Sequence, residues 1–243
     1  MKKPDSAVFE LAKNGDVESQ CMLAEYYLET DSKLSNIWLK RAAEQNDSWA
    51  QYQLGIAYAQ GNGCRKNLTK ARYYYERSSK QGFDSAQLNL GIILASLKGE
   101  ARDLAQAVKL FKLAAKQGNK NACYNLGYYY DIGRYFPEDK ELAYKWHLKA
   151  ANLGEIESNR IVGYFLHEGI GVRKNFKKSA SYYTIAAEGG DSYAQYNLGL
   201  CYSDGEGVVK DVKQAEYWFK EAAEQGHESA IERLAEMEVI LHS

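Results

Sequence analysis

The side chains that could do chemistry in this sequence are few, and their spacing indicates neither a catalytic site nor a metal site. The histidines are His147, His167, His227 and His242, and the cysteines are Cys21, Cys64, Cys123 and Cys201. No histidines form an HExxH zinc motif and no cysteines form a CxxC pair. The GxxxxGKS/T phosphate loop and the SxxK motif of penicillin-recognising serine enzymes do not occur either. We therefore predict no metal, no cofactor and no enzyme activity.

The charges of the sequence balance, which limits the class of partner. The chain has 31 Lys and Arg against 32 Asp and Glu, so its total charge does not indicate the basic surface that nucleic acids require. No stretch approaches the roughly 20 apolar residues of a membrane span, and the first residues lack the apolar region of a secretory signal. We expect a cytoplasmic protein that binds neither nucleic acid nor membranes.

An internal repeat determines how the side chains are positioned. Five glycines stand 36 residues apart, each preceded by Leu or Val: Gly55, Gly91, Gly127, Gly163 and Gly199. The same spacing separates a second set of glycines, Gly82, Gly118, Gly154, Gly190 and Gly226. It also separates a set of Asn and Asp residues, Asn67, Asp103, Asp139, Asn175 and Asp211. Three independent registers with one period predict a solenoid of stacked repeats.

Each repeat has the pattern of two helices. The first follows A-x-x-x-L-G-x-x-Y, as in Ala194, Leu198, Gly199 and Tyr202, which puts Ala, Leu and Tyr on one face. Because the glycine has no Cβ, we expect a neighbouring helix to approach closely there. A Gly-x-Gly turn follows, then an Asn or Asp that can cap the second helix. A glycine suited to the left-handed conformation ends that helix.

The period divides the chain into six repeats between two capping helices. We predict a single solenoid domain, 1–243, in which 5–15 is the N-terminal cap and 227–243 the C-terminal cap. The repeats are then 16–46, 47–82, 83–118, 119–154, 155–190 and 191–226. The first repeat is five residues shorter than the others, and its deletion falls in the turn near Asp31. The fold class that follows is all-α.

These motifs resemble the Sel1-like repeat, a tetratricopeptide-like helical repeat. The best copy runs from Ala194 to Gly226, with the turn Gly205-Glu206-Gly207-Val208 and the segment Trp218-Phe219-Lys220. The resemblance covers nearly the whole chain. It implies a right-handed α/α superhelical solenoid, of a kind that mostly serves as an adaptor in protein assemblies, often in bacteria.

Two features depart from the family pattern. The Gly-x-Gly turn is replaced by Leu97-Lys98-Gly99 in one repeat and by Gly133-Arg134-Tyr135 in the next. Secreted bacterial relatives often carry a disulfide in each repeat, whereas the cysteines of this chain do not recur with the repeat. This departure agrees with the expected cytoplasmic location.

In such stacks the first helices line the concave surface, where the resemblance implies that a partner binds. Relative to the repeated Leu, positions five and two before it, and two and five after it, face away from the stacking side. Here they are mostly aromatic or aliphatic: Trp49, Tyr52, Ile56, Leu88, Ile92, Tyr124, Tyr128, Tyr164, His167, Tyr193, Tyr196 and Leu200. We predict that they form an aromatic groove in which Trp and Tyr are hot spots. The alternative is that superhelical packing buries some of them between adjacent repeats.

The predicted function is a protein-binding scaffold or adaptor whose concave groove takes a partner protein or a peptide segment. A bacterial immunity protein that occludes a toxin is an alternative form of this function. An unrecognised hydrolase would need a nucleophile and a base brought together by the fold. A homodimer formed through the concave face is a further alternative. His147 stands at an aromatic position of a second helix, so we expect a structural role for it.

Overall fold

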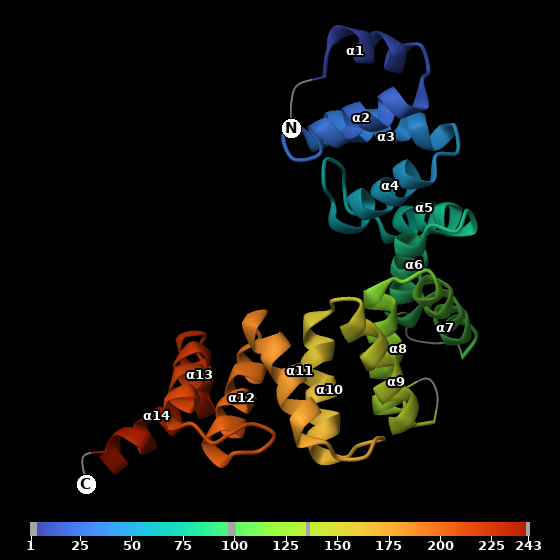
Figure 1. Ribbon diagram of the computed structural model, residues 1–243. Helices are drawn as coiled ribbons and strands as arrows, with labels where there is room; N and C mark the ends of the chain where they lie inside the picture. Colours follow the sequence, from blue (N-terminus) through green and yellow to red (C-terminus); the bar gives the residue numbers. More distant parts are fainter. Residues whose placement is uncertain (1–3, 97–100, 135–136, 242–243) are drawn as a thin grey trace. The chain divides into compact units, whose positions relative to one another are not determined.

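The computed structural model describes residues 4–96, 101–134 and 137–241, and every regular element in these ranges is an α-helix (Figure 1). The predicted all-α fold of two-helix repeats is confirmed. The helices are α1 (Ser6–Lys13), α2 (Val17–Tyr27), α3 (Ser32–Glu44), α4 (Ser48–Gln60), α5 (Leu68–Lys80), α6 (Asp84–Ser96), α7 (Ala101–Lys116), α8 (Lys120–Ile132), α9 (Lys140–Asn152), α10 (Ile156–Glu168), α11 (Phe176–Glu188), α12 (Ser192–Asp204), α13 (Val212–Glu224) and α14 (Glu228–Leu241). The turn Leu97-Lys98-Gly99, Tyr135 and His242 lie outside the described residues.

The helices form two compact units, Met1–Gln117 and Gly118–Ser243. In each unit, consecutive helices pack as antiparallel hairpins, such as α4 with α5 in the first unit and α12 with α13 in the second. The prediction that 1–243 forms a single domain stays a prediction. Within the described residues, no helix has the length and apolar composition needed to cross a membrane.

Side chains cap the second helices as the Asn and Asp register predicts. Asp211 accepts hydrogen bonds from the backbone N–H groups of Lys213 and Gln214 at the start of α13. The equivalent caps are Asp31, Asn67, Asp139 and Asn175. The exception is Asp103, because α7 already begins at Ala101 and Asp103 lies within its first turn.

The repeated glycine of the first helix lies beneath a ring of the second helix in the same hairpin. A Cβ on Gly199 would come within 2.5 Å of the Phe219 ring, and a Cβ on Gly163 within 2.7 Å of the Tyr183 ring. The same arrangement pairs Gly55 with Tyr75, Gly91 with Phe111, and Gly127 with His147. The predicted close approach is therefore confirmed, and the neighbour is the partner helix of the hairpin.

Where the Gly-x-Gly turn is present, its second glycine lets the hairpin contact the one before it. Gly207 has a φ of +79°, and a Cβ there would overlap the carbonyl group of Phe176 at the start of α11. Both the left-handed backbone and the close approach exclude larger residues. The contact fixes the turn that carries Glu206 against the preceding repeat.

A buried hydrogen-bond motif, which we call the glutamine clasp, also joins successive hairpins. The Gln51 side chain is fully buried; its Nε2 donates to the Ala43 carbonyl of the preceding hairpin (3.3 Å), and its Oε1 accepts from Gln81 Nε2 (2.9 Å). The same amide pairing recurs in Gln45–Gln20, Gln117–Gln87 and Gln225–Gln195. The fourth and fifth repeats carry other residues at these two positions: Cys123 and Leu153, then Asn159 and Gly189.

Candidate functional site

The predicted groove residues fall into two sets, one in each unit. Trp49, Tyr52, Ile56, Leu88 and Ile92 belong to the first unit, and the remaining seven belong to the second. Within each set, the exposure and the packing of a residue depend on its position relative to the repeated Leu. Whether the two sets form one groove stays a prediction.

The tyrosines two residues before the repeated Leu are used in packing between repeats. The Tyr52 ring lies 5.0 Å from the Phe83 ring, just before α6, and partial burial raises the pKa of its hydroxyl. Partial burial raises the pKa of Tyr124 to about 12, helped by the nearby charge of Glu157 on α10, with which it forms a hydrogen bond. Each tyrosine thus joins its first helix to the first helix of the next repeat.

Tyr196 and Leu88 complete this row. Tyr196 is stacked on His227, which directly precedes α14, with ring centroids 4.7 Å apart. Leu88 is only 6% exposed, which corrects the prediction that it lines an open groove. The side chain is buried because residues at this position pack inside the stack of hairpins. Packing between adjacent repeats, the alternative to an open groove, therefore accounts for the aromatic residues two before the repeated Leu.

The residues five before the Leu differ between the units. Trp49 is half-buried on α4, whereas Tyr193 on α12 is 62% exposed. The Tyr193 ring meets the His227 ring edge-on at 4.9 Å, and the Arg160 guanidinium lies 5.5 Å from its centroid. Tyr193 is therefore held in place by its neighbours while its ring stays accessible.

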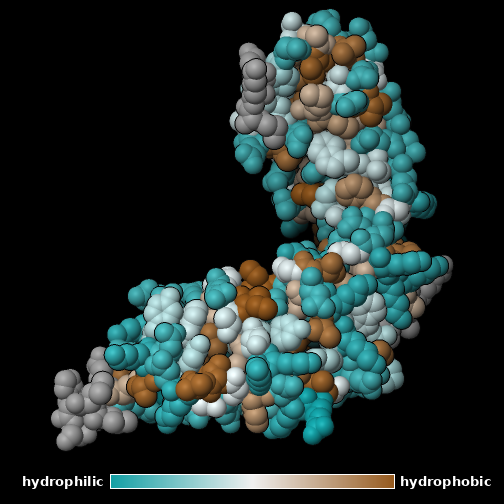
Figure 2. Space-filling view, in the orientation of Figure 1, coloured by the Kyte–Doolittle hydropathy of each residue, from teal (hydrophilic) through white to brown (hydrophobic). Residues whose placement is uncertain are grey.

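The residues two after the Leu come to the surface. In the first unit Ile56 is half-buried and Ile92 is 44% exposed. In the second unit Tyr128 is 40% exposed, Tyr164 is 47% exposed and Leu200 is half-buried. We call Tyr128, Tyr164 and Leu200 the apolar row; they occupy equivalent positions on α8, α10 and α12. Figure 2 shows that apolar side chains on the visible face form patches among hydrophilic ones.

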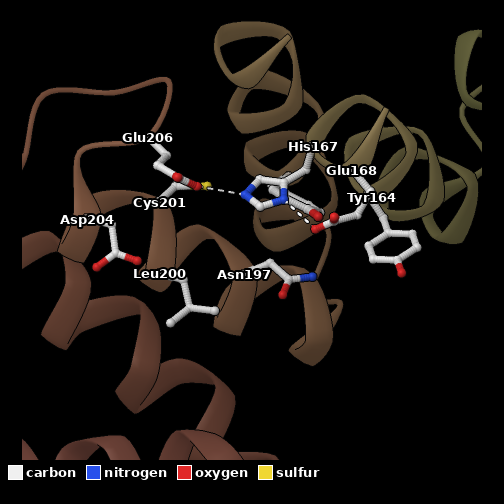
Figure 3. A pocket seen from close by; sticks show the side chains of 9 residues that line it. Tyr164, His167, Glu168, Asn197, Leu200, Cys201, Asp204 and Glu206 are labelled. Atoms are coloured by element: carbon white, nitrogen blue, oxygen red, sulfur yellow. Dashed lines mark hydrogen bonds and ion pairs between the residues drawn. The ribbon is translucent and has the colours of Figure 1, made fainter. Parts of the chain in front are cut away.

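A pocket lies beside the apolar row in the second unit (Figure 3). We call it the His167 pocket; it is lined by Tyr164, His167, Glu168, Tyr183, Asn197, Leu200, Cys201, Asp204 and Glu206. Helices α10, α11 and α12 and the turn after α12 supply these side chains. Apolar and aromatic surface therefore meets three carboxylates in one concave site.

His167 is held between two of these carboxylates (Figure 3). Its Nε2 lies 2.7 Å from Glu206 Oε2 and its Nδ1 lies 2.8 Å from Glu168 Oε1. Partial burial lowers the pKa of His167, but the hydrogen bonds and charges of Glu168 and Glu206 outweigh this effect, so the pKa is raised. Because Glu206 belongs to the turn of the next repeat, His167 also links two repeats.

The buried reactive groups of the pocket are not activated. Burial and the charges of Glu206 and Asp204 raise the pKa of the Cys201 thiol to about 11, so it stays protonated at neutral pH. Burial also raises the pKa of the Tyr183 hydroxyl well above its ordinary value. A thiolate nucleophile is therefore disfavoured here. Among the described residues, no group of His, Cys, Asp and Glu has the arrangement of a metal site.

His147 lies in the core and not in a site. It is buried beneath Tyr124, with ring centroids 5.6 Å apart, and its Nδ1 has no hydrogen-bond partner among the described residues. Burial lowers its pKa to about 4, which keeps the ring neutral. These observations support the structural role predicted for it.

Apart from His167, the sequence-based prediction omitted the polar residues of the His167 pocket. Glu168 and Asp204 stand four residues after Tyr164 and Leu200, one helical turn along the same faces. That offset was a usable signal. Glu206 and Asn197 had none, because their approach to the pocket depends on how the turn and α12 pack.

Comparison with known proteins identifies the repeat. The family described as Sel1 repeat matches residues 17–47, 50–83, 84–119, 120–155, 156–191 and 192–227. A solved protective antigen present in uropathogenic Escherichia coli strains, described as displaying an SLR fold, is 32% identical with a TM-score of 0.89, over 96% of this chain and 51% of that chain. A Sel1 repeat protein from Oxalobacter formigenes is 30% identical with a TM-score of 0.77, over 88% of this chain and 86% of that chain.

The likeness extends to more distant structures. An immunity protein from Pseudomonas aeruginosa is 19% identical with a TM-score of 0.53, over 92% of this chain and 83% of that chain, and this likeness concerns the fold alone. This chain spans about half the length of the E. coli antigen. No curated protein matches the sequence of this chain.

Proposed function

This chain belongs to the Sel1 repeat family, and from that premise we propose that it is a protein-binding scaffold whose second unit takes a protein or peptide segment on its first-helix face. The observation that carries the proposal is the apolar row, Tyr128, Tyr164 and Leu200, which recurs at one position of three successive first helices. A cytoplasmic adaptor role is part of this proposal.

The apolar row differs from the aromatic residues that the fold itself uses. The rings of Tyr52 and Tyr196 contact Phe83 and His227, and Tyr124 interacts with Glu157 on α10, so packing explains them. Tyr128 and Tyr164 keep two fifths or more of their surface exposed. Exposed tyrosines beside a concave pocket are typical of surfaces where a few aromatic side chains contribute most of the binding energy.

The test is co-purification from native lysate with the full chain as bait. The informative variant is Tyr128→Ser/Tyr164→Ser/Leu200→Ser. The matched control is Ile185→Ser/Tyr217→Ser, which removes two exposed apolar side chains from the second helices of the same unit. Circular dichroism must show that both variants remain folded.

We expect a partner that the control retains and the apolar-row variant loses. A captured toxin would identify the scaffold as an immunity protein, which also acts by binding. Equal recovery of all partners by both variants would overturn the proposal, because binding would then not depend on the apolar row.

A further inference from the structure

We propose that the segment bound by the second unit is basic, and that it inserts an arginine or lysine side chain into the His167 pocket next to an apolar side chain on the apolar row. This inference rests on the proposed function and specifies the chemistry of the partner. It is carried by the arrangement of charge along α10 and α12.

Carboxylates follow two of the three members of the apolar row by one helical turn. Glu168 stands four residues after Tyr164, and Asp204 four residues after Leu200, so each helix presents an apolar side chain and then an acid on the same face. Glu206 adds a third carboxylate from the turn. A segment lying along this face would meet apolar surface and negative charge side by side.

The negative charge of the pocket is only partly neutralised from within. His167 is hydrogen-bonded to Glu168 and Glu206, and Lys174 Nζ lies 4.0 Å from Glu168. Asp204 has no ion pair among the described residues. Even when His167 is protonated, three carboxylates face two cations. The raised pKa of the buried Cys201 thiol, to which both Asp204 and Glu206 contribute, is consistent with this field.

The other pocket residues suit a cationic side chain. The exposed ring of Tyr164 can lie against a guanidinium or ammonium group. The Asn197 side chain offers a further carbonyl acceptor, and the carboxylates accept charge-assisted hydrogen bonds. Leu200 covers the aliphatic stem of such a side chain. These are the groups that recognise arginine in proteins.

The first unit lacks this combination and provides an internal comparison. On α4 and α6 the equivalent pairs are Ile56 with Gln60 and Ile92 with Ser96, so no acid follows the apolar residue. In the first repeat an acid, Glu29, is present, but Glu25 stands in place of the apolar residue. The overall charges differ in the same direction: residues 118–243 contain 19 Asp and Glu against 14 Lys and Arg, whereas residues 1–117 contain 13 against 17. Charge complementarity therefore favours a basic segment on the second unit.

The experiment uses a random-sequence peptide library panned on the full chain. Enriched peptides are synthesised, and fluorescence anisotropy gives their affinity for the wild type, for Glu168→Gln/Asp204→Asn, and for the control Glu141→Gln/Glu216→Gln. The control removes the same charge from exposed positions on α9 and α13. We expect enrichment of Arg or Lys beside apolar residues. The pocket variant should lose roughly ten-fold in affinity and the control less than about two-fold.

The outcomes separate this inference from the proposed function. Binding lost in Tyr128→Ser/Tyr164→Ser/Leu200→Ser but unchanged in the pocket variant, or enrichment of acidic peptides, would overturn the basic-segment proposal and leave the scaffold. A library that yields no binder to this face would overturn both. If the pocket variant is unfolded by circular dichroism, the salt dependence of wild-type binding decides, because an ionic contact weakens as salt increases.

Discussion

His147 occupies a position that four other repeats give to Tyr or Phe: Tyr75, Phe111, Tyr183 and Phe219. Its ring fills the same space above Gly127, but it brings a titratable nitrogen into the core. The fold favours the neutral ring, because burial lowers the pKa from an ordinary 6.5 to about 4. A fall of that size corresponds to about 3 kcal/mol.

We predict that His147→Phe makes the second unit less sensitive to acid. Stability that depends on neutral His147 is fully present above pH 6.5 and is lost as the pH falls toward about 4. Between pH 7 and pH 5, the wild type should lose about 2 kcal/mol more of its free energy of unfolding than the variant. Urea unfolding followed by circular dichroism at both pH values measures this difference.

The reciprocal variant provides the control. Phe219→His places a histidine over Gly199, the position equivalent to His147 in another repeat. This variant should acquire the same acid sensitivity. Parallel pH profiles for the wild type and His147→Phe would contradict the prediction.

Residue roles were predictable where chemistry is local and less so where packing decides. The caps at Asp31, Asn67 and Asp211 follow from their distance to the repeated motifs. The packing of Tyr124 and Tyr196 against the next repeat could not be predicted in this way. Helical periodicity gives the direction of a side chain on its own helix, but it does not identify the neighbouring residue that the side chain contacts. The contacts of the second-unit tyrosines depend on α10 and α14, which the periodicity of α8 and α12 does not describe.

At the scale of the helix pair, the most regularly repeated contact is that of a ring of the second helix packed on the glycine of the first helix. Alanine is the better helix former, by about 1 kcal/mol. A Cβ on Gly199 would nonetheless approach the Phe219 ring within 2.5 Å, in a core where that ring is almost fully buried. Propensity and packing therefore oppose each other at this position.

We predict that packing prevails and that Gly199→Ala destabilises the protein by about 1–3 kcal/mol. The measurement is chemical denaturation followed by circular dichroism. Adding Phe219→Leu should give a double variant whose loss is smaller than the sum of the two single losses, since the smaller side chain makes room for the methyl group. Additive losses, or a Gly199→Ala variant as stable as the wild type, would refute this account of the glycine.

The hairpins were the most predictable level of the structure. Their helices follow from apolar periodicity, and their ends from glycines whose φ is positive, as at Gly82 and Gly226. The start of α7 was not predictable in this way, because it begins ahead of its register residue, Asp103. The glutamine clasp was not predictable either, because the sequence does not distinguish a buried glutamine from one at the surface.

For the whole molecule, the sequence leaves open whether two copies pair through the concave face. The apolar row would favour such pairing, but Glu168, Asp204 and Glu206 lie beside it. Two copies meeting through this face would bring like charges together, which costs free energy. A partner of opposite charge avoids that cost.

We therefore predict that the protein is a monomer. Size-exclusion chromatography with light scattering should give a mass near 27.5 kDa at low and high concentration. A mass of twice this value that reverts to the monomer in Tyr128→Ser/Tyr164→Ser/Leu200→Ser would instead identify a second copy as the occupant of the face.

The number and order of repeats were predictable from the period alone, and the family match agrees with them. The division into two compact units was not, because the same motifs continue across residues 117 and 118. The partner is least predictable of all, since binding chemistry depends on the few residues that vary between repeats.

The glutamine clasps have a consequence for how the chain opens. Three of the clasps also bond to a carbonyl of the preceding helix, through Gln20, Gln51 and Gln195, so the neighbours that they join should exchange their amide hydrogens together. In the fifth repeat Asn159 bonds instead to the Glu155 carbonyl of its own helix region, and Gly189 has no side chain to return the bond. The junction between α9 and α10 therefore lacks a clasp, and we expect one cooperative block of the second unit to end there and another to begin.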